Sequence, residues 1–288
     1  MFVSGFTFVR NAVKFDYPVI ESIRSLLPLV DELVVCLGNS EDSTSALIHA
    51  IGDPKIRIID SVWDDSLREG GRVLAVETDK ALRAVSPKAD WCIYLQADEV
   101  IHEDDYPAIR EAMKNYLEER EVEGLLFDYV HFYGSYRYTG NSRRWYRHEI
   151  RIVRQDSRIH SYKDAQGFKF EGRRLHVKKA GARIFHYGWV KSPAHQQEKQ
   201  KSFHRLWHSD EKVKTMVRDA PFDYSGIDSL EYFKGTHPAV MRQRVDDMNW
   251  DFKFDTSRKN MVFKDRLLHF IEIKTGKRLF EYRNYKLI

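Results

Sequence analysis

The stretch DWCIYLQADE, residues Asp90–Glu99, runs through five consecutive apolar positions and then ends in polar ones. A short, wholly apolar run of this kind is typical of a strand buried on both faces of a parallel sheet. In such sheets ligands bind beyond the carboxyl ends of the strands. We therefore expect Gln96, Asp98 and Glu99 to lie in a binding site.

Similar strands alternate with amphipathic helices on both sides of this stretch. The pattern predicts strands at 2–9, 32–37, 56–59, 91–95 and 125–132, with helices from Pro18, within the segment 38–51, from Arg72 and from Tyr106. This alternation predicts an α/β fold with a mostly parallel sheet flanked by helices. The polar residues that follow the other strands, among them Arg10, Asn39 and Trp63, should then meet the tip of the quoted strand.

Beyond residue 133 the pieces become shorter, more basic and more aromatic. Hairpin strands are expected at 149–153 and 182–186, and helical spacing returns at 195–208 and 262–273. No Pro/Gly/Ser-rich linker separates the halves. We therefore expect residues 1–133 to form an α/β part and residues 134–288 a basic, partly helical part of one domain. This second part would be an α+β extension that closes over the site.

Composition indicates a folded protein, with 42% hydrophobic and 13% aromatic residues. Cys36 and Cys92 both lie in strand-like runs, so we expect core packing rather than catalysis or metal binding. The start lacks the pattern of a leader peptide, and charges interrupt every long apolar run. A cytoplasmic location without a transmembrane segment is the expectation.

Charge is unevenly distributed along the chain. Residues 31–105 hold 17 acids and 7 bases (7 − 17 = −10), whereas residues 131–214 hold 20 bases and 7 acids (20 − 7 = +13). The acidic part suits a cation and the basic part suits an anionic ligand, although two ordinary solvated surfaces would give the same counts. The adjacent carboxylates of Asp98 and Glu99 similarly suit either Mg²⁺ or Mn²⁺ beside a substrate phosphate, or a helix cap or lysine pair.

The chain contains three segments, FTFVRNA, VDELVVCLGNSEDST and DWCIYLQADEV, in an order that resembles the family 2 glycosyltransferases. The nucleotide-sugar-binding domain of that family has the GT-A fold. FTFVRNA resembles the first strand and nucleoside loop of that family, VDELVVCLGNSEDST its second strand and turn, and DWCIYLQADEV the segment ending in its DxD-type acidic motif. The likeness covers residues 3–133 and extends loosely to about 205. It implies that residues 1–133 are the nucleotide-sugar-binding part and residues 134–288 the acceptor-side and C-terminal helical part of one GT-A-like domain. Two positions differ: Leu37 and Gly38 stand where an acid usually ends the second strand, and Gln96 stands where the metal motif usually begins with aspartate.

The resemblance implies a role for each candidate residue, and implies transfer with inversion from a nucleotide diphosphate sugar to a glycan or lipid-linked acceptor. A cation, Mg²⁺ or Mn²⁺, would be held by Asp98 and by a histidine from the C-terminal part, for which His186 is the best candidate. The base would be Asp164, or else Glu99. The donor-binding residues would be Arg10, Asn11, Asn39, Asp42, Trp63, Asp64, Arg72, Gln96 and Asp98.

Three features stay open. The segment at residues 131–151 mixes rings with arginines, which suits a glycan or simple packing, and less readily a nucleic acid. The basic amphipathic helix from Val262 is expected to pack on the core, rather than on another subunit or an anionic membrane surface. The alternative functions are a nucleotidyltransferase, which would need a Gly-rich phosphate loop with lysine, and a nucleotide-sugar-binding protein without turnover.

Overall fold

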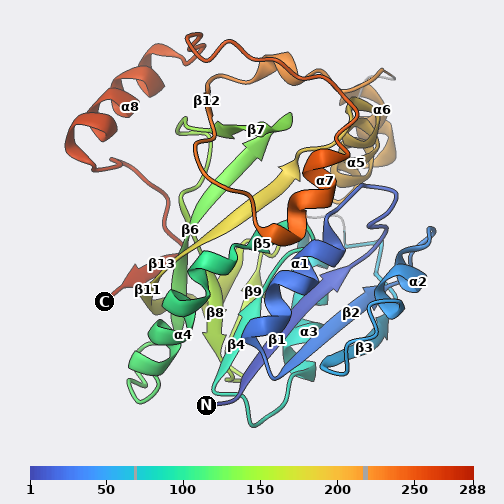
Figure 1. The fold of residues 1–288 in the computed structure, drawn as a ribbon, viewed down its shortest axis with the longest axis vertical. Coiled ribbons are helices and arrows are strands. Elements are labelled where there is room, and N and C mark those ends of the chain that lie inside the picture. Colours follow the sequence, from blue (N-terminus) through green and yellow to red (C-terminus); the bar gives the residue numbers. More distant parts are fainter. Residues whose placement is uncertain (68–69, 217–219) are drawn as a thin grey trace.

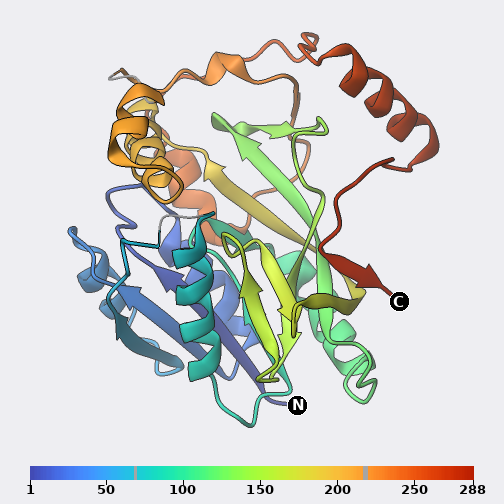
Figure 2. The same ribbon diagram turned by 180° about the vertical axis from the view of Figure 1, so that it is seen from behind.

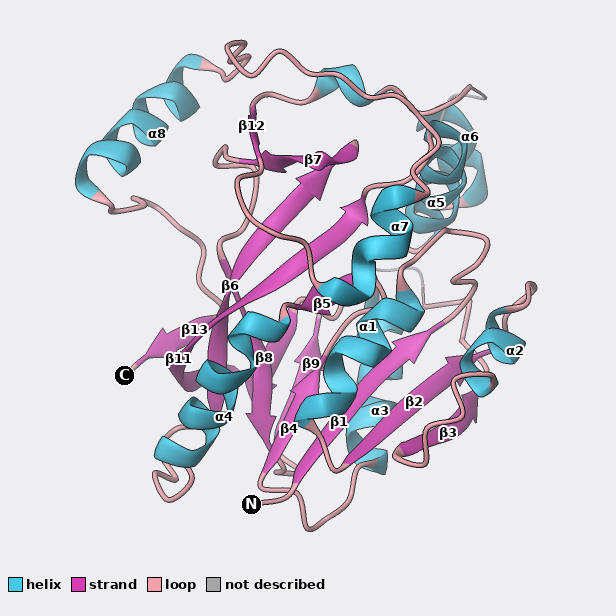
Figure 3. Cartoon of the chain, in the orientation of Figure 1, coloured by secondary structure: helices cyan, strands magenta, loops and turns pink. Residues whose placement is uncertain are grey.

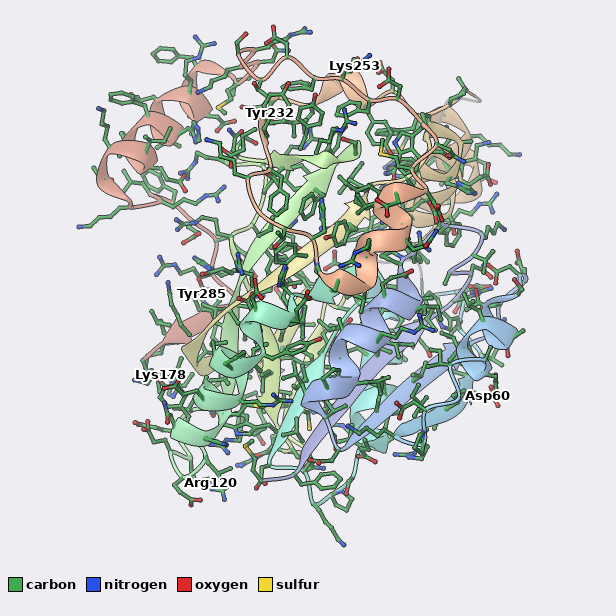
Figure 4. All side chains as sticks on the ribbon, viewed as in Figure 1. Asp60, Arg120, Lys178, Tyr232, Lys253 and Tyr285 are labelled. Carbon is green, nitrogen blue, oxygen red and sulfur yellow. The ribbon has the colours of Figure 1, made fainter. Side chains whose placement is uncertain are left out.

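The computed structural model describes residues 1–67, 70–216 and 220–288. It shows one large, curved sheet with helices on both faces (Figure 1). The predicted class is confirmed: an α/β sheet flanked by helices, continued by a C-terminal α+β extension, with the sheet parallel in its first part and mixed as a whole. Asp60 on the outer strand of the first part and Tyr285 near the C-terminus lie on opposite sides of the molecule (Figure 4).

The first half forms the parallel part of the sheet. Its strands lie in the order β3 (Ile56–Ser61), β2 (Glu32–Gly38), β1 (Val3–Val9) and β4 (Trp91–Tyr94). The helices between them are α1 (Val19–Leu26), continued by the 3₁₀ turn η1 (Leu27–Leu29), then α2 (Thr44–His49) and α3 (Arg72–Ala84). Strands β1, β2 and β4 are almost wholly buried, as their apolar runs predict.

The sheet continues through an antiparallel strand from later in the chain. Strand β8 (His148–Arg154) lies between β4 and β6 (Gly124–Tyr133) and is antiparallel to both. The strand expected at 125–132 is therefore present, but it is not the parallel neighbour of β4. The strands expected at 149–153 and 182–186 are also present, as β8 and part of β11 (Arg173–Trp189), yet they pair with other strands and not as one hairpin.

The second part adds strands and helices around β11 (Figure 3). Strand β11 pairs with β6, β5 (Glu99–Ile101), β10 (Gly167–Phe170) and β13 (Tyr285–Leu287). The remaining elements are β7 (Ser135–Gly140), β9 (Ile159–Tyr162), β12 (Leu230–Tyr232), η2 (Glu103–Asp105), α4 (Tyr106–Asn115), α5 (Pro193–Arg205), α6 (Asp210–Met216), η3 (Tyr224–Gly226), η4 (Ala239–Met241), α7 (Arg242–Asp246) and α8 (Phe263–Thr275).

Each face of the sheet has its own core. Helices α1 and α4 cover one face, where Ile23 and Ile109 pack with Leu33 and Ile93. Helix α3 and strands β9 and β10 cover the other face, where Leu82 and Phe168 pack with Phe6 and Tyr94 (Figure 2). The two cysteines, Cys36 and Cys92, are free thiols buried in this second core, as expected.

Helix α8 departs from the expectation for the C-terminus. It begins one residue later and ends two residues later than the predicted helix, but none of its residues is buried, and Phe263 is 81% exposed. Figures 1 and 2 both show α8 standing apart from the sheet, connected through long loops. The expectation that it packs on the core was wrong, because periodicity predicts an apolar stripe without specifying what covers it.

Candidate functional site

The site forms where β4 turns into β5. The chain reverses through Gln96–Asp98, and β5 then runs antiparallel to β11 with Glu99 opposite His186. The backbone N–H of Tyr187 donates to the carbonyl of Asp98 over 2.8 Å. These ladder bonds place the side chains of Asp98 and His186 on the same side of the turn.

Asp98 and His186 face each other there. Oδ2 of Asp98 lies 3.7 Å from Nε2 of His186, and both side chains are nearly buried, at 13% and 12% exposed. The ammonium of Lys199, on α5, lies 3.2 Å from the same carboxylate oxygen and donates to the carbonyl of Gly188 over 2.9 Å. The turn after β4, the strand β11 and the helix α5 thus each contribute one charged or titratable group.

Gly188 makes this close approach possible. A Cβ at Gly188 would lie 2.6 Å from Oδ2 of Asp98 and 2.6 Å from Nε2 of His186. Both distances are far inside van der Waals contact, so any side chain at Gly188 would displace the two groups. The YGW sequence after His186 therefore serves the site directly through its glycine.

A second histidine fixes the tautomer of His186. Nε2 of His131 lies 2.7 Å from the carbonyl of Tyr146, which can only accept, so His131 carries its proton there. Burial, and next the neighbouring His186, hold the pKa of His131 well below its usual range, so its Nδ1 is an acceptor. Nδ1–H of His186, 3.0 Å away, donates to it. Nε2 of His186 is therefore the ring nitrogen that faces Asp98, 3.7 Å from its Oδ2.

The surrounding charges keep Asp98 ionised. Burial would raise its pKa, but Lys199, His186 and Lys191 together hold the pKa well below its usual range. Lys191 is itself fully buried, donates to the carbonyl of Phe15 over 2.8 Å, and has its pKa lowered well below its usual value, first by burial and then by Lys199. Asp98 is therefore an anion, and the Lys199 ammonium lies 3.2 Å from it.

Glu99 has a different environment from Asp98. Its carboxylate accepts from Nε and Nη2 of Arg151 over 2.8 and 2.7 Å, from the hydroxyl of Tyr129 over 2.7 Å, and from the backbone of Gln96 over 3.1 Å. Both Glu99 and Arg151 are buried. Four donors occupy the lone-pair sites of the carboxylate, which corrects the expectation that Glu99 is available as a base.

The predicted nucleoside residues after β1 and β2 mostly tie loops together. The side-chain oxygen of Asn11 accepts from the backbone of Glu41, and that of Asn39 accepts from the backbone of Trp63. Asp42 accepts from the backbones of Lys14 and Thr44 over 2.7 and 2.9 Å. Burial would raise the pKa of Asp42, but these bonds and the Thr44 hydroxyl lower it.

Arg10 and Trp63 form a second polar feature beside these loops. The guanidinium of Arg10 lies 5.5 Å from the ring centre of Trp63, and Nη1 pairs with Asp65 over 2.8 Å. Nε of Arg10 and Nε1 of Trp63 are buried without a hydrogen-bond partner among the described residues. A Cβ at Gly38 would lie 2.4 Å from that indole nitrogen. The glycine at the end of β2 thus makes room for Trp63.

Two other predicted residues, Asp64 and Arg72, lie outside the group around Asp98. Asp64 is exposed and accepts from Ser66 in a local turn, which lowers its pKa. Arg72 is exposed at the first position of α3. Neither residue has a described contact with Asp98, so the structure does not join them to the core of the site.

The loop that carries Asp164 contacts the end of β4. Nε2 of Gln96 donates to the carbonyl of Ala165 over 3.3 Å, so the loop lies against the β4 tip. The residues flanking Asp164, Lys163 and Ala165, both have left-handed backbones with φ of 56° and 62°. Burial raises the pKa of Asp164. A strained loop holding a carboxylate with a raised pKa is consistent with a functional position.

The side chains fit a divalent ion that is shared with a ligand. Neighbouring ligands of Mg²⁺ lie about 3 Å apart and opposite ones about 4 Å apart, so the 3.7 Å between Asp98 and His186 suits two ligands of one ion. Nε2 of His186 faces that carboxylate. Across residues 1–67, 70–216 and 220–288 no group of three or more His, Cys, Asp or Glu side chains could hold a metal. Further ligands would come from a phosphate and water, and Lys199 would have to yield its place on Asp98.

Several groups of the site were not predicted from the sequence. These are His131, Lys191, Lys199 and Arg151. Gly188, two residues after the predicted ligand, was the available signal for close packing. Lys199 and His131 carry no local motif, because α5 and β6 bring them to Asp98 only through the fold.

Other residues of the segment 131–151, besides His131 and Arg151, take part in packing contacts. In the segment 131–151 the rings of Tyr133, Tyr136 and Tyr138 are buried in the aromatic cores of the second part. Arg143 and Arg147 pair with the acids Glu272 and Glu281, which favours packing over ligand binding.

A cavity of about 490 Å³ lies at the opposite end of β11 from His186 and is lined largely by basic residues. No described helix has both the length and the apolar content needed to cross a membrane.

Comparisons with known proteins give likenesses of structure alone. No family model and no curated protein matches the chain. S. aureus TarS aligns at 13% identity and a TM-score of 0.39, over 70% of this chain and 39% of TarS. TarS 1–349 in complex with UDP aligns at 12% identity and a TM-score of 0.41, over 75% of this chain and 70% of that one.

Glucosyl-3-phosphoglycerate synthase from Mycobacterium tuberculosis, in complex with Mn²⁺, UDP and phosphoglyceric acid, aligns at 21% identity and a TM-score of 0.31, over 45% of this chain and 43% of the synthase. The chain thus spans about two fifths of the length of TarS and of the synthase. At these identities and TM-scores, functional inference rests on the residues of this chain.

Proposed function

We propose that the protein is a glycosyltransferase that moves a sugar from a nucleotide diphosphate sugar to a glycan or lipid-linked acceptor. The observation that carries this proposal is the meeting of Asp98 and His186 at the end of β4, with Nε2 of His186 facing the carboxylate. The sequence resemblance to family 2 glycosyltransferases supports the same assignment. A divalent cation bound by these two residues would neutralise the charge on a diphosphate leaving group.

The donor lies across the ends of β1, β2 and β4 in this proposal. The unpaired N–H groups of Arg10 and Trp63 donate to the nucleotide, and Asn11, Asn39 and Asp42 hold the loops that place them. Arg72, at the head of α3, contacts the diphosphate, and Asp64 lines the donor side. Gln96 contributes through its amide, which holds the Asp164 loop.

Asp164 acts as the base. Transfer with inversion needs a carboxylate that takes the proton of the acceptor hydroxyl as its oxygen attacks C1 of the sugar and the diphosphate leaves. Burial raises the pKa of Asp164, which makes it a stronger proton acceptor than an exposed aspartate. Glu99 is committed to Arg151 and Tyr129 and instead holds the strand end rigid.

One observation favours a second candidate, a nucleotide-sugar-binding protein without turnover. Lys199 already supplies a positive charge to Asp98 at 3.2 Å. A tethered ammonium can bind a diphosphate, but it does not leave and return with the ligand as a metal ion does. The two candidates differ in whether sugar is released from the bound donor.

A panel of UDP-, GDP- and dTDP-sugars, with Mn²⁺, Mg²⁺ or EDTA, tests these assignments. Binding is followed by calorimetry and nucleotide diphosphate release by a coupled assay. Slow hydrolysis that is lost in Asp98→Asn with unchanged folding supports the transferase. Binding without hydrolysis under every metal condition favours the second candidate, and an absence of binding across the panel overturns both.

A further inference from the structure

Helix α8 presents a continuous apolar stripe to solvent. Phe263, Leu267 and Phe270 are spaced i, i+4 and i+7 and lie 81%, 51% and 57% exposed, and Ile273 at 63% extends the stripe. Such spacing places these side chains on one side of a helix. Burial of a stripe of this kind would ordinarily stabilise a fold, so its exposure indicates a surface that another body covers.

The charged residues of α8 are sorted between its two sides. Lys264, Arg266 and Lys274 are exposed along with the apolar stripe. Glu272 is only 16% exposed and faces the body of the protein, where it pairs with Arg143 at 2.9 Å and Arg147 at 3.4 Å. The outward side therefore combines rings and aliphatic groups with cations.

The helix is held in this orientation by specific contacts. Besides its pairs with Glu272, Arg143 donates through Nη2 to the carbonyl of Leu279, and Arg278 donates to the carbonyl of Arg143. These bonds tie both Glu272 and the chain after α8 to the loop that follows β7. The apolar stripe is thus turned outward by the fold and is not the free side of a loose segment.

The apolar surface continues beyond the helix. Gly276 ends α8 in the left-handed conformation, and Phe280 is 89% exposed with φ of 57°, a backbone that aromatic residues rarely adopt. Tyr282 is 58% exposed. An exposed ring on a strained backbone indicates that this conformation presents Phe280 for contact.

We propose that α8 and the residues after it dock the protein on an anionic lipid surface. An apolar face flanked by lysine and arginine is the composition of helices that lie in the membrane interface. Residues 256–288 hold 9 bases and 3 acids (9 − 3 = +6), which complements anionic headgroups. A helix of 13 residues is about 20 Å long, too short to cross a bilayer core of about 30 Å, so α8 lies parallel to the surface.

A second copy of the chain fits this surface less well. Two copies meeting through the same face would bring Lys264, Arg266 and Lys274 against their own equivalents, and like charges oppose such a contact. Lipid binding by α8 involves none of the groups around Asp98, so it holds or fails independently of the proposed transfer.

Vesicle flotation of the full chain tests the proposal. Vesicles of phosphatidylcholine alone are compared with vesicles of equal parts phosphatidylcholine and phosphatidylglycerol, at low and high salt. We expect binding to the anionic vesicles only, weakened by salt. The double variants Phe263→Ser/Phe270→Ser and Lys264→Glu/Lys274→Glu should each lower the partition coefficient by about tenfold or more.

Matched controls replace exposed residues elsewhere: Val62→Ser, at a valine 74% exposed, and Lys88→Glu. Both should bind as the parent does, and thermal unfolding should show every variant folded because all the altered side chains are exposed. Absence of vesicle binding, or equal binding by all variants, overturns the proposal. Self-association in sedimentation velocity that the Phe263→Ser/Phe270→Ser variant abolishes, without vesicle binding, assigns the stripe to a second copy and also overturns it.

Discussion

Nδ1 of His131 lies 3.0 Å from Nδ1 of His186, and this contact decides which nitrogen of His186 faces Asp98. Histidines that bind metals commonly donate their other N–H to a fixed acceptor, which sets the tautomer and the ring orientation. Here the acceptor is a second imidazole, whose own proton is held by the carbonyl of Tyr146. His131 is therefore a positioning residue for the proposed cation site.

Replacing His131 should weaken cation binding without removing a ligand. In His131→Phe the ring shape is kept but Nδ1 is lost, so His186 can take either tautomer. Mn²⁺ affinity, measured by electron paramagnetic resonance titration, should fall about 10- to 100-fold. The ¹⁵N shifts of the His186 imidazole should show a mixture of tautomers. His237→Phe, which alters a histidine bonded to Tyr187 and Tyr136, is the control and should change neither readout. Unchanged Mn²⁺ affinity in His131→Phe would contradict the assignment.

Gly188→Ala should disrupt the site while the fold persists. The new Cβ would meet both Asp98 and His186 at 2.6 Å, so one of the two must move. We expect Mn²⁺ and nucleotide-sugar binding to fall by about tenfold or more, with a cost in stability of about 1–3 kcal/mol from the added contact. Gly226→Ala is the control, since nothing lies within 4 Å of its Cβ position and its φ is not positive. Equal ligand affinity in both variants would show that the close approach is unimportant.

Residue patterns predicted the parts of the site that follow local rules. Asp98 and His186 each end an apolar run, and the carboxyl ends of strands are where sheets gather ligands. Asp98 lies in the turn after β4 and His186 lies three residues before the end of β11, so both are near strand ends of one sheet. The same rule placed Asp42 and Asn39 near the site, although their side chains are used to join loops.

Long-range pairing explains what the sequence did not predict. Glu99 looked available as a base because its partner, Arg151, is 52 residues away and belongs to a strand inserted antiparallel beside β4. Lys199 comes to Asp98 from a helix whose position depends on the end of β11. Likewise, the periodicity of α8 predicted a helix but not which surface its apolar side meets. Register and packing across distant segments set all three, and a single sequence does not encode them in any local pattern.

Glu99→Gln should destabilise the protein more than any change at Asp98. The substitution leaves the buried Arg151 guanidinium without its counter-charge, and breaking such a pair typically costs about 3–5 kcal/mol. Urea unfolding checks this, with Glu198→Gln as the control because the Glu198 side chain is half exposed where it pairs with Lys201. The control should change stability by less than about 0.5 kcal/mol. A Glu99→Gln protein as stable as the parent, but inactive, would return Glu99 to a catalytic role.

Glu149 should give the stability a dependence on pH near neutrality. Burial raises the pKa of Glu149 to about 7, despite the nearby Arg151 and the amide donors of Asn284 and Gln166. The folded state then keeps a proton that the unfolded chain, with an ordinary pKa near 4.5, has lost. Stability from this group is therefore full below pH 4.5 and falls as pH rises toward 7, by at most about 3 kcal/mol.

The variant Glu149→Gln removes that titration. Its stability relative to the parent, measured by urea unfolding at a series of pH values, should rise between pH 4.5 and 7 and stay level above that range. Glu171→Gln, at an exposed position, serves as the control and should show no such trend. A difference between Glu149→Gln and the parent that is the same at every pH would show that Glu149 ionises normally in the folded protein.

Lys199→Met tests whether the ammonium and a metal ion compete for Asp98. The methionine keeps much of the length of the side chain but removes the charge that lies 3.2 Å from the carboxylate. Because a charge-assisted hydrogen bond of this kind contributes about 1.5–3 kcal/mol, its loss should strengthen Mn²⁺ binding by about tenfold or more. In EDTA, the same variant should bind nucleotide diphosphates more weakly than the parent does. Without a metal ion, the Lys199 ammonium of the parent supplies the positive charge beside Asp98, and the variant lacks it.

The two effects have opposite signs, which distinguishes competition from simple damage to the site. Lys201→Met, on the same helix and paired with Glu198, is the matched control and should alter neither affinity. If Lys199→Met weakens nucleotide binding with and without Mn²⁺, Lys199 supports the fold of the site and does not compete with the ion. If it strengthens Mn²⁺ binding and restores hydrolysis of a donor that the parent only binds, Lys199 is the group that keeps the parent silent.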